Sequence, residues 1–183
     1  SRLEVLISQQ LSQLSFKDAE FAIEFGKIPF TAEGTDNAEF MINTNKDEPL
    51  KPLSKIASGG EMSRIMLAFK KVIGDYDEIP TMIFDEIDSG ISGIAASVVG
   101  RKLREIAETH QIICITHLPQ IAAYARSSYR IAKHSDDEMT YTTVDSLTPD
   151  EQVRDIARLL GGENITDTTL ASAGELIEAS KKN

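Results

Sequence analysis

Two short, unbroken apolar runs constrain the fold of this chain more than any other feature. They are residues 81–84 (TMIF) and 112–115 (IICI), and a segment with helical periodicity, 92–108, lies between them. A strand, a helix and a second apolar strand make a βαβ unit, whose strands are parallel and buried on both faces. The chain is therefore predicted to be an α/β domain with a mostly parallel sheet flanked by helices.

The other predicted elements are distributed along the rest of the chain. Aromatic and β-branched residues favour strands at 21–25 and 38–42, which are separated by Gly34 and Asp36-Asn37 and therefore indicate a hairpin or a meander. Residues 43–52 are polar and contain two prolines, which is typical of a loop. Periodicity and start and stop residues predict helices at 58–73, 148–161 and 167–180, and a polar strand pair, 128–133 with 139–147, at a sheet edge.

Residues 1–14 form one further predicted helix. Leucine and isoleucine recur there every three or four positions, with serine and glutamine elsewhere. The periodicity leaves two interpretations open: an ordinary amphipathic helix, or the last turns of a longer coiled coil.

The composition excludes several classes of protein. The 183 residues suffice for one compact domain, and 19 basic against 29 acidic residues give a net charge of −10. That balance argues against a surface that binds nucleic-acid phosphates over its whole area. One cysteine allows no internal disulfide, and no apolar run approaches the roughly 18 residues of a membrane span.

A local excess of basic residues stands out against this acidic background. Between residues 51 and 71 there is one acidic residue, Glu61, and the basic residues are Lys51, Lys55, Arg64, Lys70 and Lys71. This excess has three explanations: contact with DNA, balance of an acidic nucleotide, or a solvated helix face.

The first cluster of candidate functional residues is Ser58-Gly59-Gly60-Glu61, at the start of the predicted helix 58–73. Ser58 and Glu61 have the spacing of a capping box, which alone explains both. Capping does not explain two glycines in a first turn, where each costs about 1 kcal/mol relative to alanine. Glycines let an anion approach the bare N–H groups at the positive end of the helix dipole. Phosphate contact and plain capping therefore both stay open.

The second cluster is Asp85-Glu86, directly after the apolar run 81–84. Ligands of open parallel sheets lie beyond the carboxyl ends of the strands. An aspartate there can hold Mg²⁺, usually through water, and an adjacent glutamate can orient or deprotonate an attacking water. The alternative is that Asp85 caps the following turn and Glu86 is merely solvated.

The third candidate is His117, which follows the run 112–115 and is therefore predicted at the same sheet edge as Asp85 and Glu86. A lone histidine after a strand can also be structural. Ser58, Asp85 and His117 have the chain order of an α/β-hydrolase triad, but Ser58 has no G-x-S-x-G elbow. Cys114 and the three histidines lack the paired spacing of a zinc site.

Taken together, the three clusters resemble the carboxyl-terminal half of an ABC-type ATPase head. The matching segments are 57–61 (ASGGE) for the signature motif, 81–86 (TMIFDE) for Walker B, 89–92 (SGIS) for the D-loop and His117 for the switch histidine. The longer stretches 53–61, 84–93, 116–122, 158–162 and 165–166 resemble the SMC-like ATPases of bacterial DNA repair, so that the resemblance covers nearly the whole chain. Two positions depart from transporter sequences: Glu61 stands where Gln is frequent, and Ser92 where a D-loop usually ends in Asp.

The resemblance implies a role for each matched residue. Asp85 would help to hold Mg²⁺ on ATP, Glu86 would position and activate the hydrolytic water, and His117 would contact the γ-phosphate. The signature residues would bind ATP held mainly by a second head, and the residues of this motif are Ser58, Gly59, Gly60 and Glu61. Ser89 and Gly90 would lie at the interface of that ATP-dependent homodimer.

The chain contains no G-x-x-x-x-G-K-[ST] loop to cradle phosphates, and it begins at Ser1 rather than at methionine. By the resemblance, that Walker A loop would lie in the amino-terminal half of the same head, beyond a long coiled coil. Residues 1–15 would then end the coiled coil, and 16–183 would form the carboxyl-terminal lobe. We expect a cytoplasmic, nucleoid-associated ATPase that contacts DNA and no membrane, and a chain that is inactive alone.

Two functional interpretations follow. In the first, the chain is half of an ATPase whose full protein acts at DNA double-strand breaks. In the second, it is a non-catalytic interaction head that docks onto DNA or a repair partner. A Walker A loop upstream would favour the first interpretation, and its degeneration the second.

Overall fold

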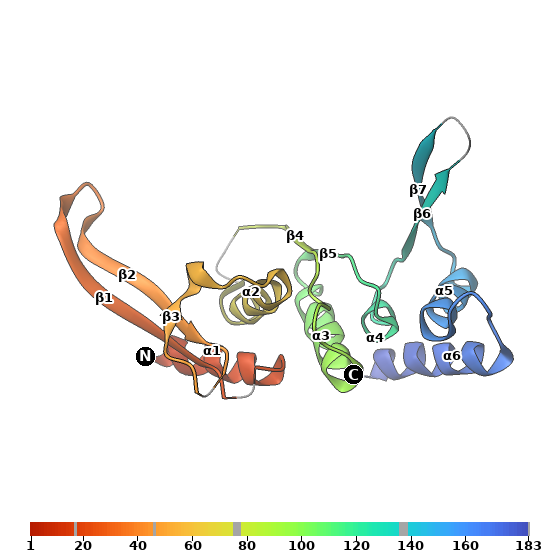
Figure 1. The fold of residues 1–183 in the computed structure, drawn as a ribbon, viewed down its shortest axis with the longest axis horizontal. Coiled ribbons are helices and arrows are strands. Elements are labelled where there is room, and N and C mark those ends of the chain that lie inside the picture. The colour runs from red at the N-terminus through yellow and green to blue at the C-terminus, as the bar shows by residue number, and fades with distance from the viewer. Residues whose placement is uncertain (17, 46, 75–77, 136–138, 183) are drawn as a thin grey trace. The chain divides into compact units, whose positions relative to one another are not determined.

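The structure of the chain is a computed structural model that describes residues 1–16, 18–45, 47–74, 78–135 and 139–182. The chain forms two compact units, which Figure 1 shows in sequence colours. The first contains residues 1–91 and 106–115, and the second contains 92–105 and 116–183. Each unit combines helices with strands, which agrees with the predicted α/β class. Within the described ranges, no helix is both long enough and apolar enough to cross a membrane.

Helix α1 (Arg2–Gln13) confirms the helix predicted at 1–14. Part of its apolar stripe is buried in the first unit, where Ile7 and Leu11 are fully inaccessible, whereas Leu6 is exposed. Its polar side chains bind the edge of the neighbouring strand: Ser8 Oγ accepts the Phe21 N–H at 3.1 Å, and Glu4 Oε1 accepts the Ile23 N–H at 2.9 Å. The helix therefore covers backbone groups that a free strand edge would expose. Its continuation into a coiled coil stays a prediction.

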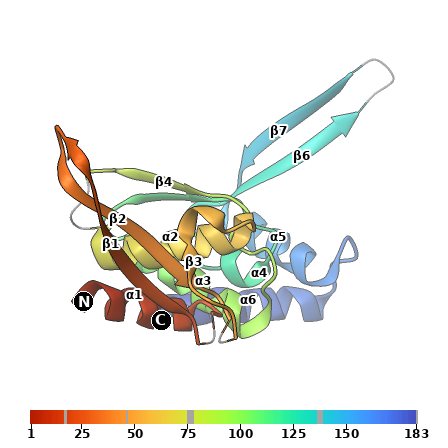
Figure 2. The same cartoon turned by 60° about the vertical axis from the view of Figure 1, so that its left-hand side comes forward.

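A three-stranded antiparallel sheet follows, in the order β1 (Glu20–Thr31), β2 (Gly34–Asn43) and β3 (Lys51–Pro52). The predicted hairpin is confirmed, with Gly34 paired to Thr31 at its turn. Asp36 and Asn37, which were predicted between the strands, instead lie within β2 and pair with Lys27 and Gly26. The ends of the hairpin are exposed on both faces and therefore carry polar residues that resemble a turn. Figure 2 shows this long hairpin rising from α1.

Helix α2 (Gly59–Ile73) follows the short 3₁₀ turn η1 (Leu53–Lys55) and packs against the sheet. The Phe69 ring lies 5.1 Å from the Phe21 ring and 5.6 Å from the Phe40 ring, centroid to centroid. Aromatic pairs at these separations add to the stabilisation from burial. At the helix start, Ser58 Oγ accepts the Glu61 N–H at 3.3 Å, which confirms Ser58 as the N-cap.

Strands β4 (Thr81–Phe84) and β5 (Gln111–Cys114) pair in parallel, as predicted, with Phe84 opposite Cys114. The prediction that both of their faces are buried is wrong. Met82 and Phe84 are buried on one face, whereas on the other Ile83 is 68% exposed, Ile113 45% and Ile115 47%. One face of the parallel pair is thus apolar and uncovered in the chain by itself.

The second unit consists mostly of helices. Its elements are α3 (Gly93–Ile106, whose last residue belongs to the first unit), α4 (Pro119–Ala122), β6 (Tyr129–Ser135), β7 (Thr140–Ser146), α5 (Pro149–Gly161) and α6 (Asp167–Lys182). Strands β6 and β7 form a two-stranded sheet of their own within the described part of the chain, so their predicted place at the edge of a larger sheet is wrong. The predicted helix start at residue 148 is confirmed, because Thr148 and Glu151 form a capping box at the start of α5.

Helices α4, α5 and α6 share a core of small and branched residues, namely Ala123, Ile156, Ala157 and Ala173. A glycine within α3 also serves packing in this unit. A Cβ on Gly100 would lie 2.5 Å from the Tyr124 ring and 3.2 Å from the Gln120 carbonyl oxygen. A Cβ on Gly174 of α6 would meet no atom within 4 Å.

These two glycines make a matched test of the packing. Gly100→Ala is expected to destabilise the chain by about 1–3 kcal/mol, because the added methyl group overpacks the Tyr124 contact. Gly174→Ala is expected to stabilise it by up to about 1 kcal/mol, because alanine favours a helix over glycine. Urea unfolding followed by circular dichroism measures both changes. A stabilising Gly100→Ala would contradict this packing.

Candidate functional site

The candidate site is built around the loop that follows strand β4. Asp85 is the first residue after the strand, and its Oδ1 accepts the Glu86 N–H at 2.9 Å. Glu86 has a φ of +56°, a left-handed conformation that costs a non-glycine residue of order 1–3 kcal/mol unless its surroundings hold it. Both side chains are exposed. Two carboxylates therefore stand at the carboxyl end of a parallel strand, as the sequence predicted.

The first turn of α2 packs directly against this loop. A Cβ on Gly59 would lie 2.6 Å from Glu86 Oε2. A Cβ on Gly60 would lie 2.7 Å from the Ser89 Cβ and 2.8 Å from the Glu86 carbonyl oxygen. Close packing within the chain is thus a reason for both glycines that the sequence did not reveal. This packing is a second reason for the glycines, beside the approach of a ligand to the helix start. Ligand contact with the exposed Ser58 and Gly59 stays a prediction.

Arg64, one turn after Gly60, ties the two segments together. Its Nη1 donates to the Ser89 carbonyl oxygen at 2.6 Å and to the Ile87 carbonyl oxygen at 3.2 Å. The guanidinium lies over the Phe16 ring, with Cζ 5.3 Å from the ring centroid. Arg64 is only 6% exposed, and this burial lowers the pKa of its guanidinium. The next side chain toward the amino terminus, Ser63, donates from Oγ to the Asp85 carbonyl oxygen at 2.8 Å.

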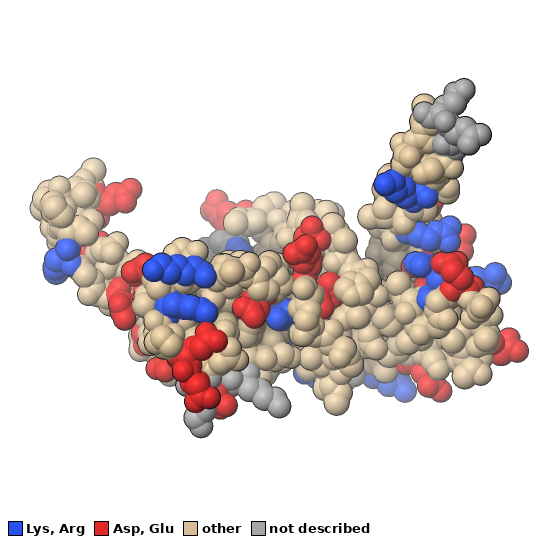
Figure 3. All heavy atoms as spheres, viewed as in Figure 1, with Lys and Arg blue, Asp and Glu red and all other residues tan. Residues whose placement is uncertain are grey.

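The burial of Arg64 also corrects the interpretation of the basic residues between 51 and 71. Arg64 binds the loop within the chain and is not available to DNA. Figure 3 shows basic side chains at the surface over β3 and η1. Lys55 is exposed, whereas Lys51 is half-buried and its Nζ lies 3.0 Å from Glu48 Oε2. The sequence missed Arg64 because a basic residue on an amphipathic helix usually indicates a solvated face. Arg64 lies four residues after Gly60 and therefore on the same face of the helix, and this spacing could have indicated its contact with the loop.

Cys114, the last residue of β5, lies close to the same acidic loop. Burial, together with the smaller effects of the Asp88 and Asp85 charges, raises the pKa of its thiol to about 12. The thiol therefore stays protonated at neutral pH, which disfavours a role as nucleophile or metal ligand. The described residues contain no cluster of three or more side chains suited to a metal site.

The remaining predicted site residues are exposed or half-buried. Ser89 and Gly90 are exposed at the end of the loop, where Gly90 has a φ of +75°, and Glu61 is half-buried in the first turn of α2. His117 is exposed and belongs to the second unit, three residues beyond the end of β5. The structure thus brings Gly59 and Gly60 to Glu86 and Ser89 within one unit. The proximity of His117 to the two carboxylates stays a prediction.

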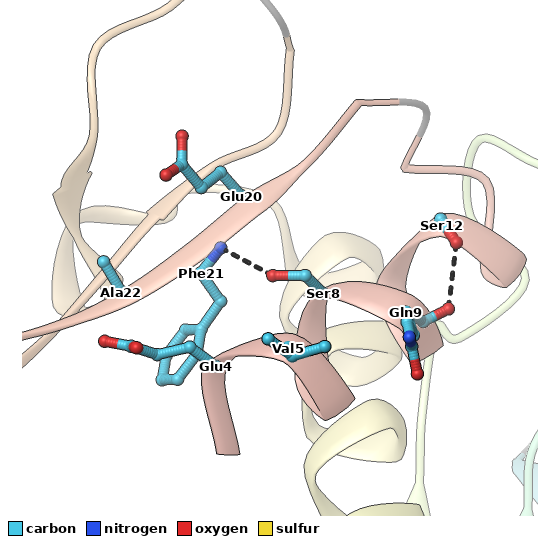
Figure 4. A pocket seen from close by; sticks show the side chains of 8 residues that line it. All are labelled: Glu4, Val5, Ser8, Gln9, Ser12, Glu20, Phe21 and Ala22. Carbon is cyan, nitrogen blue, oxygen red and sulfur yellow. Dashed lines mark hydrogen bonds between the residues drawn. The ribbon is translucent and has the colours of Figure 1, made fainter. Parts of the chain in front are cut away.

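A groove of about 640 Å³ lies elsewhere, between α1 and β1. Figure 4 shows Glu4, Ser8 and Phe21 among the residues that line it, with the hydrogen bond from the Phe21 N–H to Ser8. None of the predicted site residues lines this groove. The candidate site is therefore an exposed surface rather than this hollow.

Known sequences similar to this chain are proteins of bacterial DNA repair. The chain is 43% identical over 180 residues to the DNA repair protein RecN of Haemophilus influenzae, covering 97% of the chain and 32% of that protein. It is 43% identical over 151 residues to RecN of Bacillus subtilis, covering 82% of the chain and 26% of that protein. The chain thus spans between a quarter and a third of the length of these relatives. No protein-family model matches it.

Solved structures of similar fold are head domains of SMC proteins. The Smc head with a coiled coil and joint from Pyrococcus yayanosii has a TM-score of 0.56 at 22% identity, covering 84% of this chain and 28% of that one. The Smc head with an extended coiled coil from Pyrococcus furiosus, bound to the C-terminal domain of ScpA, has a TM-score of 0.55 at 22% identity. The match covers 79% of this chain and 34% of that one. The fold is that of an SMC-type head.

The two signature glycines are expected to respond differently to the same substitution. Gly60→Ala is expected to lower the free energy of unfolding by about 1–3 kcal/mol, because the methyl group meets backbone and a Cβ of the loop. Gly59→Ala is expected to change it by less than about 1 kcal/mol, because the flexible Glu86 carboxylate can move away. Urea unfolding without nucleotide compares them. Equal effects would contradict the packing of Gly60 against Ser89.

Proposed function

We propose that this chain, whose similarity to the RecN DNA repair proteins covers between a quarter and a third of their length, forms the carboxyl-terminal part of an ATP-hydrolysing head. In this proposal the full protein repairs DNA, and the chain supplies the signature motif, Walker B and the switch histidine. One observation carries the proposal: Asp85 and Glu86 directly follow a parallel strand, and the glycine-rich start of α2 packs against them.

The acidic pair suits the chemistry of phosphoryl transfer to water. Asp85 offers carboxylate oxygen, the ligand type that Mg²⁺ prefers, and would hold the ion through water. Bound Mg²⁺ would neutralise charge on the ATP phosphates. Glu86 would accept a hydrogen bond from the attacking water and take its proton, and a general base of this kind typically contributes 10²- to 10⁴-fold in rate. His117 would donate a hydrogen bond to the γ-phosphate.

The start of α2 suits an anion that arrives from outside the chain. Ser58 and Gly59 are exposed at the amino-terminal end of a 15-residue helix, where N–H groups and the helix dipole favour a phosphate. We propose that this phosphate is the γ-phosphate of ATP held mainly by a second head, with Gly60 and Glu61 shaping the turn. ATP would then join two heads, with the exposed Ser89 and Gly90 at their interface.

The chain needs its amino-terminal counterpart for this activity. It has no Walker A loop, and its parallel strand pair leaves Ile83, Ile113 and Ile115 uncovered. An apolar face of this kind on a parallel pair is normally covered by further strands or helices. We propose that the amino-terminal part of the same protein covers it and brings the Walker A loop. The chain alone is then expected neither to bind ATP tightly nor to hydrolyse it.

Reassembly of the head tests this function. Mixing the chain with the amino-terminal part of its protein is expected to give Mg²⁺-dependent ATPase activity that neither part has alone. Glu86→Gln is expected to lower kcat by about 10²- to 10⁴-fold, because the base is lost. Ser58→Arg is expected to abolish ATP-dependent dimerisation, measured by light scattering, because the arginine blocks the helix start.

Glu108→Gln, at an exposed site outside the loop, is the matched control and is expected to leave the rate unchanged. An equal rate for the Glu86→Gln head and the wild type would exclude Glu86 as the base. ATPase activity of the chain alone that disappears with Glu86→Gln would contradict the need for a second part.

A further inference from the structure

We propose that Arg64, assisted by Ser63, is a positioning residue that holds Glu86 and the D-loop in their catalytic arrangement. This inference rests on the proposed ATPase function. No motif named above assigns a role to either side chain beyond their place in α2. Their hydrogen bonds reach the loop at three successive points, the carbonyl groups of Asp85, Ile87 and Ser89.

The loop after β4 has a strained backbone conformation. Glu86 holds a left-handed backbone, which an isolated loop would leave for a relaxed one. The backbone of Glu86 itself makes two local hydrogen bonds: the Glu86 N–H donates to Asp85 Oδ1, and the Ser89 N–H donates to the Glu86 carbonyl oxygen. The bonds from Ser63 and Arg64 fix the carbonyl groups on both sides of Glu86. They therefore oppose its relaxation.

The hydrogen bonds from Arg64 to the loop are costly to break. The Arg64 guanidinium is buried, so it cannot exchange its acceptors for bulk water without moving the helix or the loop. A hydrogen bond from a charged donor is stronger than one between neutral groups, and the 2.6 Å bond to Ser89 is a short one. The Phe16 ring beneath the guanidinium further restricts its orientation.

Both donors lie on the helix whose start is the proposed phosphate site. Ser63 and Arg64 lie one turn beyond the proposed phosphate-binding start of α2. The loop they hold contains Glu86, the proposed base of the same chain's own Walker B. A shift of α2 on binding the phosphate of one nucleotide would therefore move the base that acts on another. Arg64 would couple the two sites through one head.

Arg64→Met and Arg64→Lys in the full-length protein test the proposal. Arg64→Met removes every donor, and we expect kcat to fall by about 10-fold or more with KM for ATP within about two-fold of wild type, since the base is misplaced but the nucleotide site is intact. Arg64→Lys keeps the charge without the forked donors, and its kcat is expected to lie between those of Arg64→Met and the wild type. Arg2→Met, at an exposed arginine of the same unit, is the matched control.

Amide hydrogen exchange without nucleotide provides a second readout that does not depend on ATPase activity. The Ser89 amide is expected to exchange about 10-fold faster in Arg64→Met, because its acceptor on Glu86 is no longer held, and to be unchanged in Arg2→Met. Unchanged exchange, or a raised KM with wild-type kcat, would overturn the proposal. If wild type and Glu86→Gln hydrolyse ATP equally, the proposed function fails while exchange still decides the role of Arg64.

Ser63→Ala keeps the test decisive if the Arg64 variants do not fold. It removes one hydroxyl from a half-buried position and leaves the core intact. We expect its kcat to fall by about three-fold or more with KM unchanged, because one of three tethers to the loop is lost. A wild-type kcat for Ser63→Ala, with unchanged exchange at Ser89, would overturn the proposal.

Discussion

A buried arginine that donates to a backbone loop is the interaction on which the rest of the site depends. The loop after β4 has a left-handed residue, two exposed carboxylates and a turn, and its neighbours in sequence do not explain why it keeps that form. Arg64 and Ser63 of α2 bind its carbonyl groups, and Gly60 allows the helix to approach closely enough for them to do so. Helix and loop are therefore one packed structure.

This packing changes the meaning of the glycine-rich motif. In the sequence, two glycines at a helix start indicate room for a phosphate. In the structure, Gly60 faces inward to Ser89, and Gly59 faces the Glu86 carboxylate. The motif can serve both phosphate binding and packing. The N–H groups at the helix start point in one direction, and the Cα atoms of the two glycines face the loop in another. A phosphate at the helix start would act on a segment already coupled to the acidic loop.

The elements that the sequence predicted well are those with a strong local signal. The apolar runs 81–84 and 112–115 could be identified as parallel strands, and Asp85 and Glu86 could be placed at a strand end from their position alone. The distal part of the β1–β2 hairpin could not be predicted, because both of its faces are solvated and its polar residues resemble a turn. The uncovered face of Ile83 and Ile113 could not either, since apolar residues do not reveal what covers them. The role of Arg64 could not be predicted from the sequence, because only the fold shows that its side of α2 faces a loop more than twenty residues away.

The most direct test of the central claim is a nuclear Overhauser measurement between the α-protons of Gly60 and the β-protons of Ser89 in nucleotide-free protein. A Cβ built on Gly60 would lie only 2.7 Å from the Ser89 Cβ, so the α-protons of Gly60 point at the Ser89 side chain at short range. A strong cross-peak is expected, because the first turn of α2 packs on the loop before any ligand binds. Absence of the cross-peak, with both resonances assigned and sharp, would contradict the claim that helix and loop form one packed structure.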